Sequence, residues 1–175
     1  MYVPEGIDKI LFTKEQIHLR TRELGEQLAC DYAGKVPLFL CVLRGAAVFF
    51  TDLIRSCEMP LTIDFIRTKS YVGTESSGKV EVDMAETDLF EGKDLVIVED
   101  ICDTGRSLTA VCDAIRDMKP KSLKTICLCD KPSRRVVDFQ PDYTGFVIDD
   151  LFVVGYGFDV DERFRNLPYI GVFKT

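Results

Sequence analysis

Three carboxylates stand within five positions at the end of an apolar run, in the segment LVIVEDICDTGRS (95–107). They belong to Glu99, Asp100 and Asp103. The turn DTGRS leads from the expected strand into a helix N-terminus, where free N–H groups, a positive dipole and two hydroxyls suit a phosphate. The acids before it would repel a phosphate, but they suit sugar hydroxyls or a bridging divalent cation. This layout predicts a site for a ribose 5-phosphate.

The same segment has an ordinary structural interpretation. Asp103 would cap the helix, and the two preceding acids would be solvated. Such caps are common, but three acids at the end of a buried strand are not, so the functional interpretation is favoured. Neither the P-loop pattern GxxxxGK[ST] nor the dinucleotide-binding pattern GxGxxG occurs in the chain.

The elements that would position these residues follow from hydrophobic periodicity. Helices are expected at 14–31, 45–57 and 105–118, the first after a capping box. Strands are expected at 36–43, 61–67, 80–84, 94–100, 122–130, 145–148 and 169–173. This alternation predicts one α/β domain over residues 1–175, with a mostly parallel central sheet flanked by helices.

Ligands of such sheets bind at the carboxyl ends of the strands. Three expected strands end in polar residues, in VLRG (42–45), VEDICDTG (98–105) and LCDK (128–131). We expect these three ends to face one crevice. The polar segment 68–79 is rich in Gly and Ser and is expected to be irregular.

Composition limits the class of protein. The 175 residues are 46% hydrophobic and 29% charged, as in globular proteins, and the net charge of −7 argues against a nucleic-acid partner. Seven cysteines without CxxC pairing indicate free thiols in a reducing cytoplasm, and the single histidine, His18, argues against a zinc site. No secretory signal or membrane-spanning stretch is evident, so no membrane partner is expected.

The segment VIVEDICDTGRSL closely resembles the phosphoribosyl-pyrophosphate signature of type I phosphoribosyltransferases. Four further segments narrow the resemblance to the hypoxanthine-guanine phosphoribosyltransferases of shorter, bacterial type: VLRGA (42–46), DFIRTKSY (64–71), LCDKPSRR (128–135) and FVVGYGFDVDERFRNLPYIG (152–171). The resemblance implies the fold of that family, with a small hood formed by N- and C-terminal segments. It also implies a homodimer or homotetramer.

The activity that this resemblance implies is purine salvage. Hypoxanthine or guanine, with xanthine as a further candidate, would be joined to phosphoribosyl pyrophosphate, and pyrophosphate would be released. Leu151 stands where many members carry a polar or basic residue, which leaves the preference among these bases open. Three rivals remain: a sister enzyme for adenine or a pyrimidine, a nucleotide-sensing regulator that binds RNA, and a non-enzymatic nucleotide-binding domain.

The resemblance assigns the sugar phosphate to the acid-rich turn. Glu99 and Asp100 would bind the ribose hydroxyls and, together with Asp159, hold the cofactor Mg²⁺. The 5-phosphate would lie against Asp103, Thr104, Gly105, Arg106 and Ser107. Asp103 would also be the catalytic group, which exchanges the proton at N7 of the purine.

The pyrophosphate and the base are assigned to other segments. Arg44 and Gly45 would form the pyrophosphate loop, in which the family often has a non-proline cis peptide before the basic residue. Arg165 would clamp the same group. Lys131 would donate to the 6-oxo group of the base, which an aminopurine lacks.

The remaining implied contacts complete the base site. Phe152 would stack on the purine, and the backbone of Val153 would read its N1/C2 edge, with Asp159 nearby. Ser70 and Tyr71 match the flexible loop that closes over the reacting centre. Without the resemblance, ordinary roles stay open: solvated charges at Arg44 and Lys131, core packing at Phe152 and Val153, and loop charges at Asp159 and Arg165.

Overall fold

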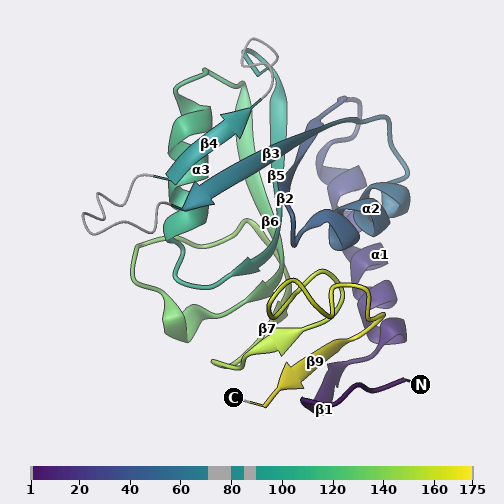
Figure 1. Ribbon diagram of the computed structural model, residues 1–175. Helices are drawn as coiled ribbons and strands as arrows, with labels where there is room; N and C mark the ends of the chain where they lie inside the picture. The colour runs from purple at the N-terminus through teal and green to yellow at the C-terminus, as the bar shows by residue number, and fades with distance from the viewer. Residues whose placement is uncertain (1, 71–79, 85–89, 175) are drawn as a thin grey trace.

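Three inner strands of the central sheet, β2 (Leu38–Leu43), β5 (Asp94–Cys102) and β6 (Ser122–Asp130), are largely buried on both faces, as their unbroken apolar runs predict. Figure 1 shows the sheet with its helices. The computed structural model describes residues 2–70, 80–84 and 90–174. The sheet order is β4-β3-β2-β5-β6-β7. Its other strands are β3 (Thr62–Ser70), β4 (Val80–Met84) and β7 (Tyr143–Val147). Five strands are parallel, and β4 pairs antiparallel with β3 at the edge.

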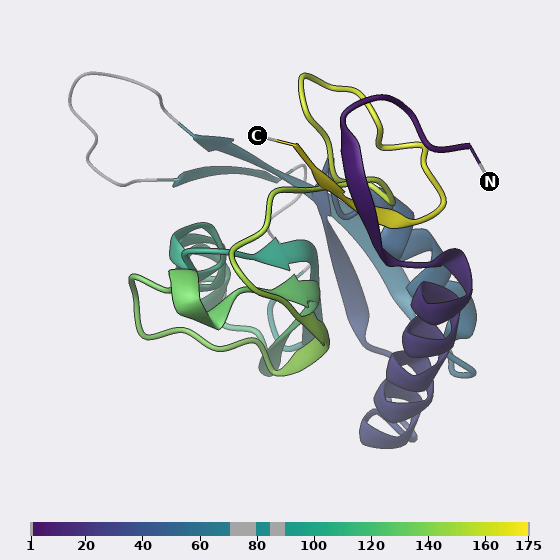
Figure 2. The ribbon, with the colours of Figure 1, turned by 90° about the horizontal axis from the view of Figure 1, so that it is seen from below.

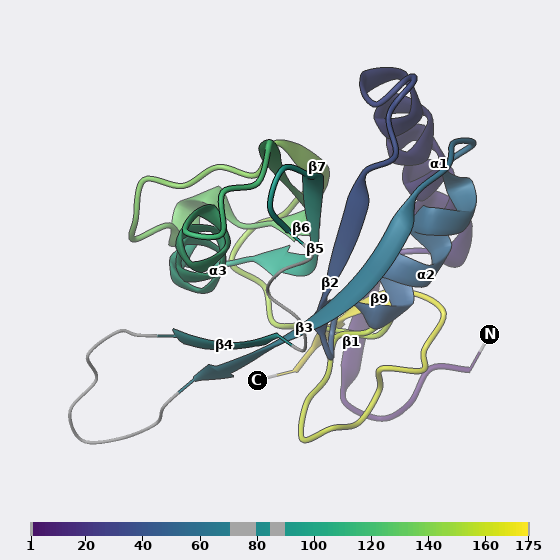
Figure 3. The ribbon, with the colours of Figure 1, turned by 90° about the horizontal axis from the view of Figure 1, so that it is seen from above.

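Helices cover the two faces of this sheet, as expected for parallel strands. Figure 3 shows α1 (Lys14–Asp31) and α2 (Ala47–Ser56) on one face and α3 (Arg106–Arg116) on the other. Alternate residues of β2 belong to the two cores. Phe39 and Cys41 pack with α1 and α2, whereas Leu38, Leu40 and Val42 pack with α3. The sheet therefore lies between two cores, and several predicted functional residues lie at the carboxyl ends of its strands.

The predicted helices are confirmed to within two residues at each end. The helix expected at 14–31 has those bounds, and Thr13 and Gln16 form its capping box, with Thr13 N–H donating to Gln16 Oε1 at 2.9 Å. The helices expected at 45–57 and 105–118 are shorter, at 47–56 and 106–116. No helix in the described part of the chain is long and apolar enough to cross a membrane.

A second, three-stranded sheet forms the hood. Its order is β1-β9-β8, from β1 (Ile7–Phe12), β8 (Val153–Val154) and β9 (Ile170–Phe173). Figure 2 shows the first strand beside the C-terminal strand, so the two ends of the chain build one layer. The hood from N- and C-terminal segments is confirmed. Periodicity did not predict β1, whose pairing with β9 contains two register shifts that break the alternation of buried residues.

Candidate active site

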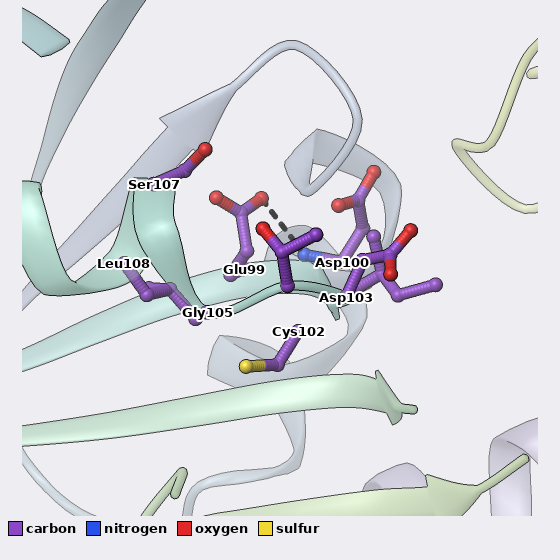
Figure 4. A pocket seen from close by; sticks show the side chains of 9 residues that line it. Glu99, Asp100, Cys102, Asp103, Gly105, Ser107 and Leu108 are labelled. Carbon is purple, nitrogen blue, oxygen red and sulfur yellow. Dashed lines mark hydrogen bonds between the residues drawn. The ribbon is translucent and has the colours of Figure 1, made fainter. Parts of the chain in front are cut away.

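The acid-rich segment lies at the carboxyl end of β5, where it borders a cavity of about 230 Å³. The cavity is lined by Glu99, Asp100, Ile101, Cys102, Asp103, Thr104, Gly105, Ser107 and Leu108. In Figure 4 the three carboxylates point away from the thiol of Cys102, which turns to the opposite side of the strand. The cavity lies at the acid-rich strand end, as predicted. Of the three strand ends that were expected to face one crevice, the end of β5 is the one that lines it among the described residues.

Glu99 and Asp100 are adjacent carboxyl groups whose negative charges are unfavourable in this partly buried place. Both side chains are partly buried, and Asp100 N–H donates to Glu99 Oε1 at 3.0 Å. Burial raises the pKa of Glu99 well above its ordinary value, and the neighbouring Asp100 charge raises it further. Burial also raises the pKa of Asp100, although a hydrogen bond with Glu99 and the charge of Arg165 oppose this. Such a pair favours ligands that bring positive charge or hydroxyl donors.

The turn after β5 leaves the N-terminus of α3 facing the cavity. Gly105 is the N-cap residue, with a left-handed φ of +84°, and no side chain caps the helix. The interpretation of Asp103 as the helix cap is therefore wrong. A side chain at Gly105 would be strained at this φ and would meet Arg135 Cδ at 2.8 Å. Arg106 N–H makes a long contact with Thr104 Oγ1, at 3.4 Å, and the N–H groups of the first turn give this end of α3 an affinity for anions.

The loop after β2 packs tightly between the end of β5 and a distant segment. A Cβ on Gly45 would lie 1.7 Å from Asp100 Oδ2, and one on Gly157 would lie 2.2 Å from Gly45 O. Because β2 pairs with β5, the carboxyl ends of these strands meet, as predicted. The Leu43–Arg44 peptide is cis, in agreement with the resemblance.

Two arginines gather beside this loop. Arg165 Nη2 lies 2.8 Å from Asp159 Oδ1, and its Nη1 donates to Gly157 O at 2.7 Å. Arg44 Nη1 lies 3.0 Å from Glu162 Oε2, to which Arg165 Nη2 also comes within 3.3 Å. Glu162 was missed from the sequence because its partner Arg44 is 118 positions away. The two arginines lower the pKa of Glu162.

The predicted metal ligands are only partly brought together. Glu99 and Asp100 are neighbours, whereas Asp159 is paired with Arg165. Across residues 2–70, 80–84 and 90–174, no three acidic, histidine or cysteine side chains gather as a metal cluster. The pair at the end of β5 is therefore the part of the predicted donor set that the fold assembles.

Lys131 follows β6 and is buried, so its interpretation as a surface lysine is wrong. Only 8% of its side chain is exposed, and its backbone N–H donates to Cys102 O at 2.9 Å. Its ammonium lies 3.8 Å from Asp150 Oδ1. The end of β6 thus places a cation beside the turn that carries Asp103.

Phe152 and Val153 have different environments. Phe152 is 45% exposed, so its interpretation as a core residue is wrong, and its ring meets the ring of Phe173 edge-on at 6.1 Å. Val153 is buried and pairs with Val172 in the hood, as a core residue would. An exposed ring fixed by a neighbouring ring is suited to stacking on a flat ligand.

Arg106, Ser70 and Tyr71 are the remaining predicted residues. Arg106 is exposed and does not line the cavity. Tyr71 and the side chain of Ser70 lie outside the described residues. Conversely, the sequence did not single out Arg134, Arg135 and Asp150, which contact the predicted residues. Arg135 Nη1 donates to Cys102 O at 2.9 Å. LCDKPSRR gave the only signal for the two arginines.

Comparisons with known proteins agree with this geometry. Residues 9–162 match the phosphoribosyl transferase domain family. The hypoxanthine-guanine phosphoribosyltransferase of Streptococcus thermophilus is 46% identical over 97% of this chain and 95% of that protein. Its namesake in Bacillus subtilis is 44% identical over 96% and 94%. A solved structure of a hypoxanthine phosphoribosyltransferase from Staphylococcus aureus has a TM-score of 0.90 and 42% identity, covering 97% of this chain and 92% of that one.

Proposed function

Because the chain belongs to the phosphoribosyl transferase family, we propose that it joins hypoxanthine or guanine to phosphoribosyl pyrophosphate. It is a purine salvage enzyme, which releases pyrophosphate and a nucleoside monophosphate. One observation carries this assignment to the site. The acid pair of β5 and the N-terminus of α3 line one cavity at the carboxyl end of β5, and the buried Lys131 follows the adjacent end of β6.

The acid-rich turn binds the ribose 5-phosphate. Glu99 and Asp100 accept hydrogen bonds from the 2′ and 3′ hydroxyls, which relieves two carboxylates that burial has deprived of water. The 5-phosphate lies against the backbone of 103–107 at the N-terminus of α3, with the hydroxyls of Thr104 and Ser107 as further donors.

The same carboxylates fit the magnesium ion of the family. Mg²⁺ takes one or two protein carboxylates and completes its shell with water and substrate phosphates. Glu99 and Asp100 would hold it, and Asp159 would help to hold it from the side of the site where the pyrophosphate binds. When bound, the ion shields the negative charge of the leaving pyrophosphate.

The pyrophosphate is bound by the loop after β2 and by Arg165. Gly45 brings the backbone close to the end of β5, and the Arg44 side chain beside it is 67% exposed. Arg44 and Arg165 now pair with Glu162 and Asp159. A pyrophosphate offers them a larger negative charge and bidentate acceptors.

The base is bound between the hood and the end of β6. Phe152 stacks on the purine, the backbone of Val153 reads its N1/C2 edge, and Lys131 donates to its 6-oxo oxygen. In the transfer, the bond from C1′ to pyrophosphate breaks, N9 of the base bonds to C1′, and the N7 proton passes to Asp103. A carboxylate at this place also stabilises the positive charge that develops on the sugar.

We further propose that residues 1–175 act as one domain, that the protein is cytoplasmic and that it forms a homodimer or homotetramer. Free thiols throughout the cores support a reducing compartment. The near-complete coverage of two relatives, 95% and 94% of their lengths, supports one domain.

The decisive experiment is a base panel with the purified protein. Nucleotide formation from phosphoribosyl pyrophosphate and Mg²⁺ is measured with hypoxanthine, guanine, xanthine and adenine. We expect turnover of hypoxanthine and guanine, none with adenine, and loss of turnover when the metal is chelated. Turnover of adenine alone would contradict the role of Lys131. Binding of the sugar pyrophosphate without turnover of any base would favour a regulator.

A further inference from the structure

A row of four alternating charges runs along the side of the site where the base binds. Lys131 Nζ lies 3.8 Å from Asp150 Oδ1, and Asp150 Oδ2 lies 3.4 Å from Arg134 Nη1. Arg134 Nε then donates to Asp103 Oδ1 at 3.1 Å. The two ends of this row are the two residues assigned to the base, and the two middle residues have no role in the proposed reaction.

The segment that carries Arg134 is fixed against the acid-rich turn. It is a 3₁₀-helix, Pro132–Arg134, that directly follows Lys131, and Val136 N–H donates to Thr104 O at 3.1 Å. The guanidinium of the next residue, Arg135, donates to the carbonyl oxygens of Cys102 and Asp103. Arg134 therefore approaches Asp103 from a rigid support.

Stability gives little reason for this row. The side chains of Arg134, Asp103 and Asp150 are 45%, 38% and 56% exposed. Ion pairs that are this exposed contribute little to stability. Chemistry gives a better reason, because the 6-oxo oxygen and N7 lie side by side on one edge of a 6-oxopurine. The groups that contact these two atoms must be held at a matching spacing.

We propose that Arg134 is a positioning residue for Asp103, and that Asp150 ties it to Lys131, so that the two groups facing the O6–N7 edge are held in register. This inference rests on the proposed function. Arg134 occupies Oδ1 of Asp103, which leaves Oδ2 as the oxygen that takes the N7 proton. The guanidinium also keeps the carboxylate aimed until the base arrives.

The test compares Arg134→Met and Arg134→Lys with Arg116→Met. Arg116 forms a similar exposed ion pair, with Asp113 at 2.8 Å, at the far end of α3. We expect Arg134→Met to lower kcat/KM for hypoxanthine by roughly 10- to 100-fold, the cost of a misplaced group. The KM for phosphoribosyl pyrophosphate and the Tm should not change. Arg134→Lys should recover part of the loss, and Asp150→Asn should show a smaller loss in the same parameter.

A double-mutant cycle separates positioning from general disturbance. If Arg134 acts through Asp103, adding Arg134→Met to Asp103→Asn should cost no more than about a further twofold. An equal loss in both backgrounds, or no loss in the wild-type background, would overturn the inference while leaving the proposed function intact. A wild-type protein that turned over no base would overturn both.

Discussion

At the scale of single residues, the site is built from groups that are unfavourable for the folded chain by itself. Glu99 and Asp100 are adjacent, partly buried carboxyls, and burial raises the pKa of both. Desolvation and mutual repulsion penalise their charged forms at neutral pH. Sites that are prepared for a ligand commonly reduce stability in this way.

Glu99→Gln is therefore expected to stabilise the protein without ligands while abolishing turnover. The folded-state pKa of Glu99 is raised, so its penalty is absent below the unfolded-state value of about 4.3 and grows as the pH rises through it. Thermal unfolding without Mg²⁺ should show a Tm higher by roughly 2–4 °C at pH 8, which corresponds to about 1 kcal/mol. The gain should be smaller at pH 5.5.

The matched control is Glu91→Gln, at an exposed position just before β5. It should leave both the Tm and the turnover unchanged. A lower Tm for Glu99→Gln at pH 8 would show that Glu99 stabilises the folded protein, contrary to this account.

At the scale of elements, the site depends on three segments that approach more closely than side chains permit. The loop after β2 lies between the end of β5 and the segment around Gly157, and Gly45 is the point of contact. Its φ is not in the left-handed region, so the requirement for glycine there comes from space alone.

Gly45→Ala should therefore impair catalysis more than folding. The new methyl would lie 1.7 Å from Asp100 Oδ2, so the carboxylate or the loop must move. We expect kcat/KM to fall about 100-fold, as for a reacting group displaced by about 1 Å. The free energy of unfolding should fall by about 1–3 kcal/mol. Steady-state kinetics and urea unfolding measure the two effects.

Gly34→Ala is the matched control for this substitution. Gly34 has open space around its Cβ position but a φ of +74°. Alanine there should cost roughly 1 kcal/mol of stability through backbone strain, with turnover unchanged. Equal activity of the two variants would rule out the steric argument for Gly45.

At the scale of the whole molecule, the two cores enclose nearly all of the thiols. Six of the seven cysteines are buried, and Cys30 is exposed on α1. Burial raises the pKa of Cys41 to about 12, and the pKa values of Cys57 and Cys112 to about 11. These three thiols are both covered and protonated at pH 8, where a thiolate is the reactive species. A hydrogen bond with Cys127 lowers the pKa of Cys102, so that thiol is protected by its burial, at 1% exposure, alone.

A disulfide reagent at pH 8 should therefore modify one thiol rapidly in the native protein and seven after denaturation. Cys30→Ser should remove the rapid phase and leave activity unchanged. Rapid reaction of two or more thiols in native Cys30→Ser would show that a core opens on the timescale of the assay.

The sequence by itself determined most of the elements and the residue types at the strand ends. Periodicity is a local property, so the helix at 14–31 and the apolar strand that precedes Glu99 could be predicted without knowledge of their neighbours. The cavity at the acid-rich turn follows from those elements, because the carboxyl ends of parallel strands share one edge.

Only the tertiary structure decided which distant residues meet. The strand at 169–173 was recognised, but its place in the hood depends on pairing with β1, more than 150 positions earlier. Glu162 reaches Arg44 and Arg134 reaches Asp103 for the same reason. These pairings are set by the path of the chain around the sheet, and a charged residue in a loop carries no local pattern that names its partner.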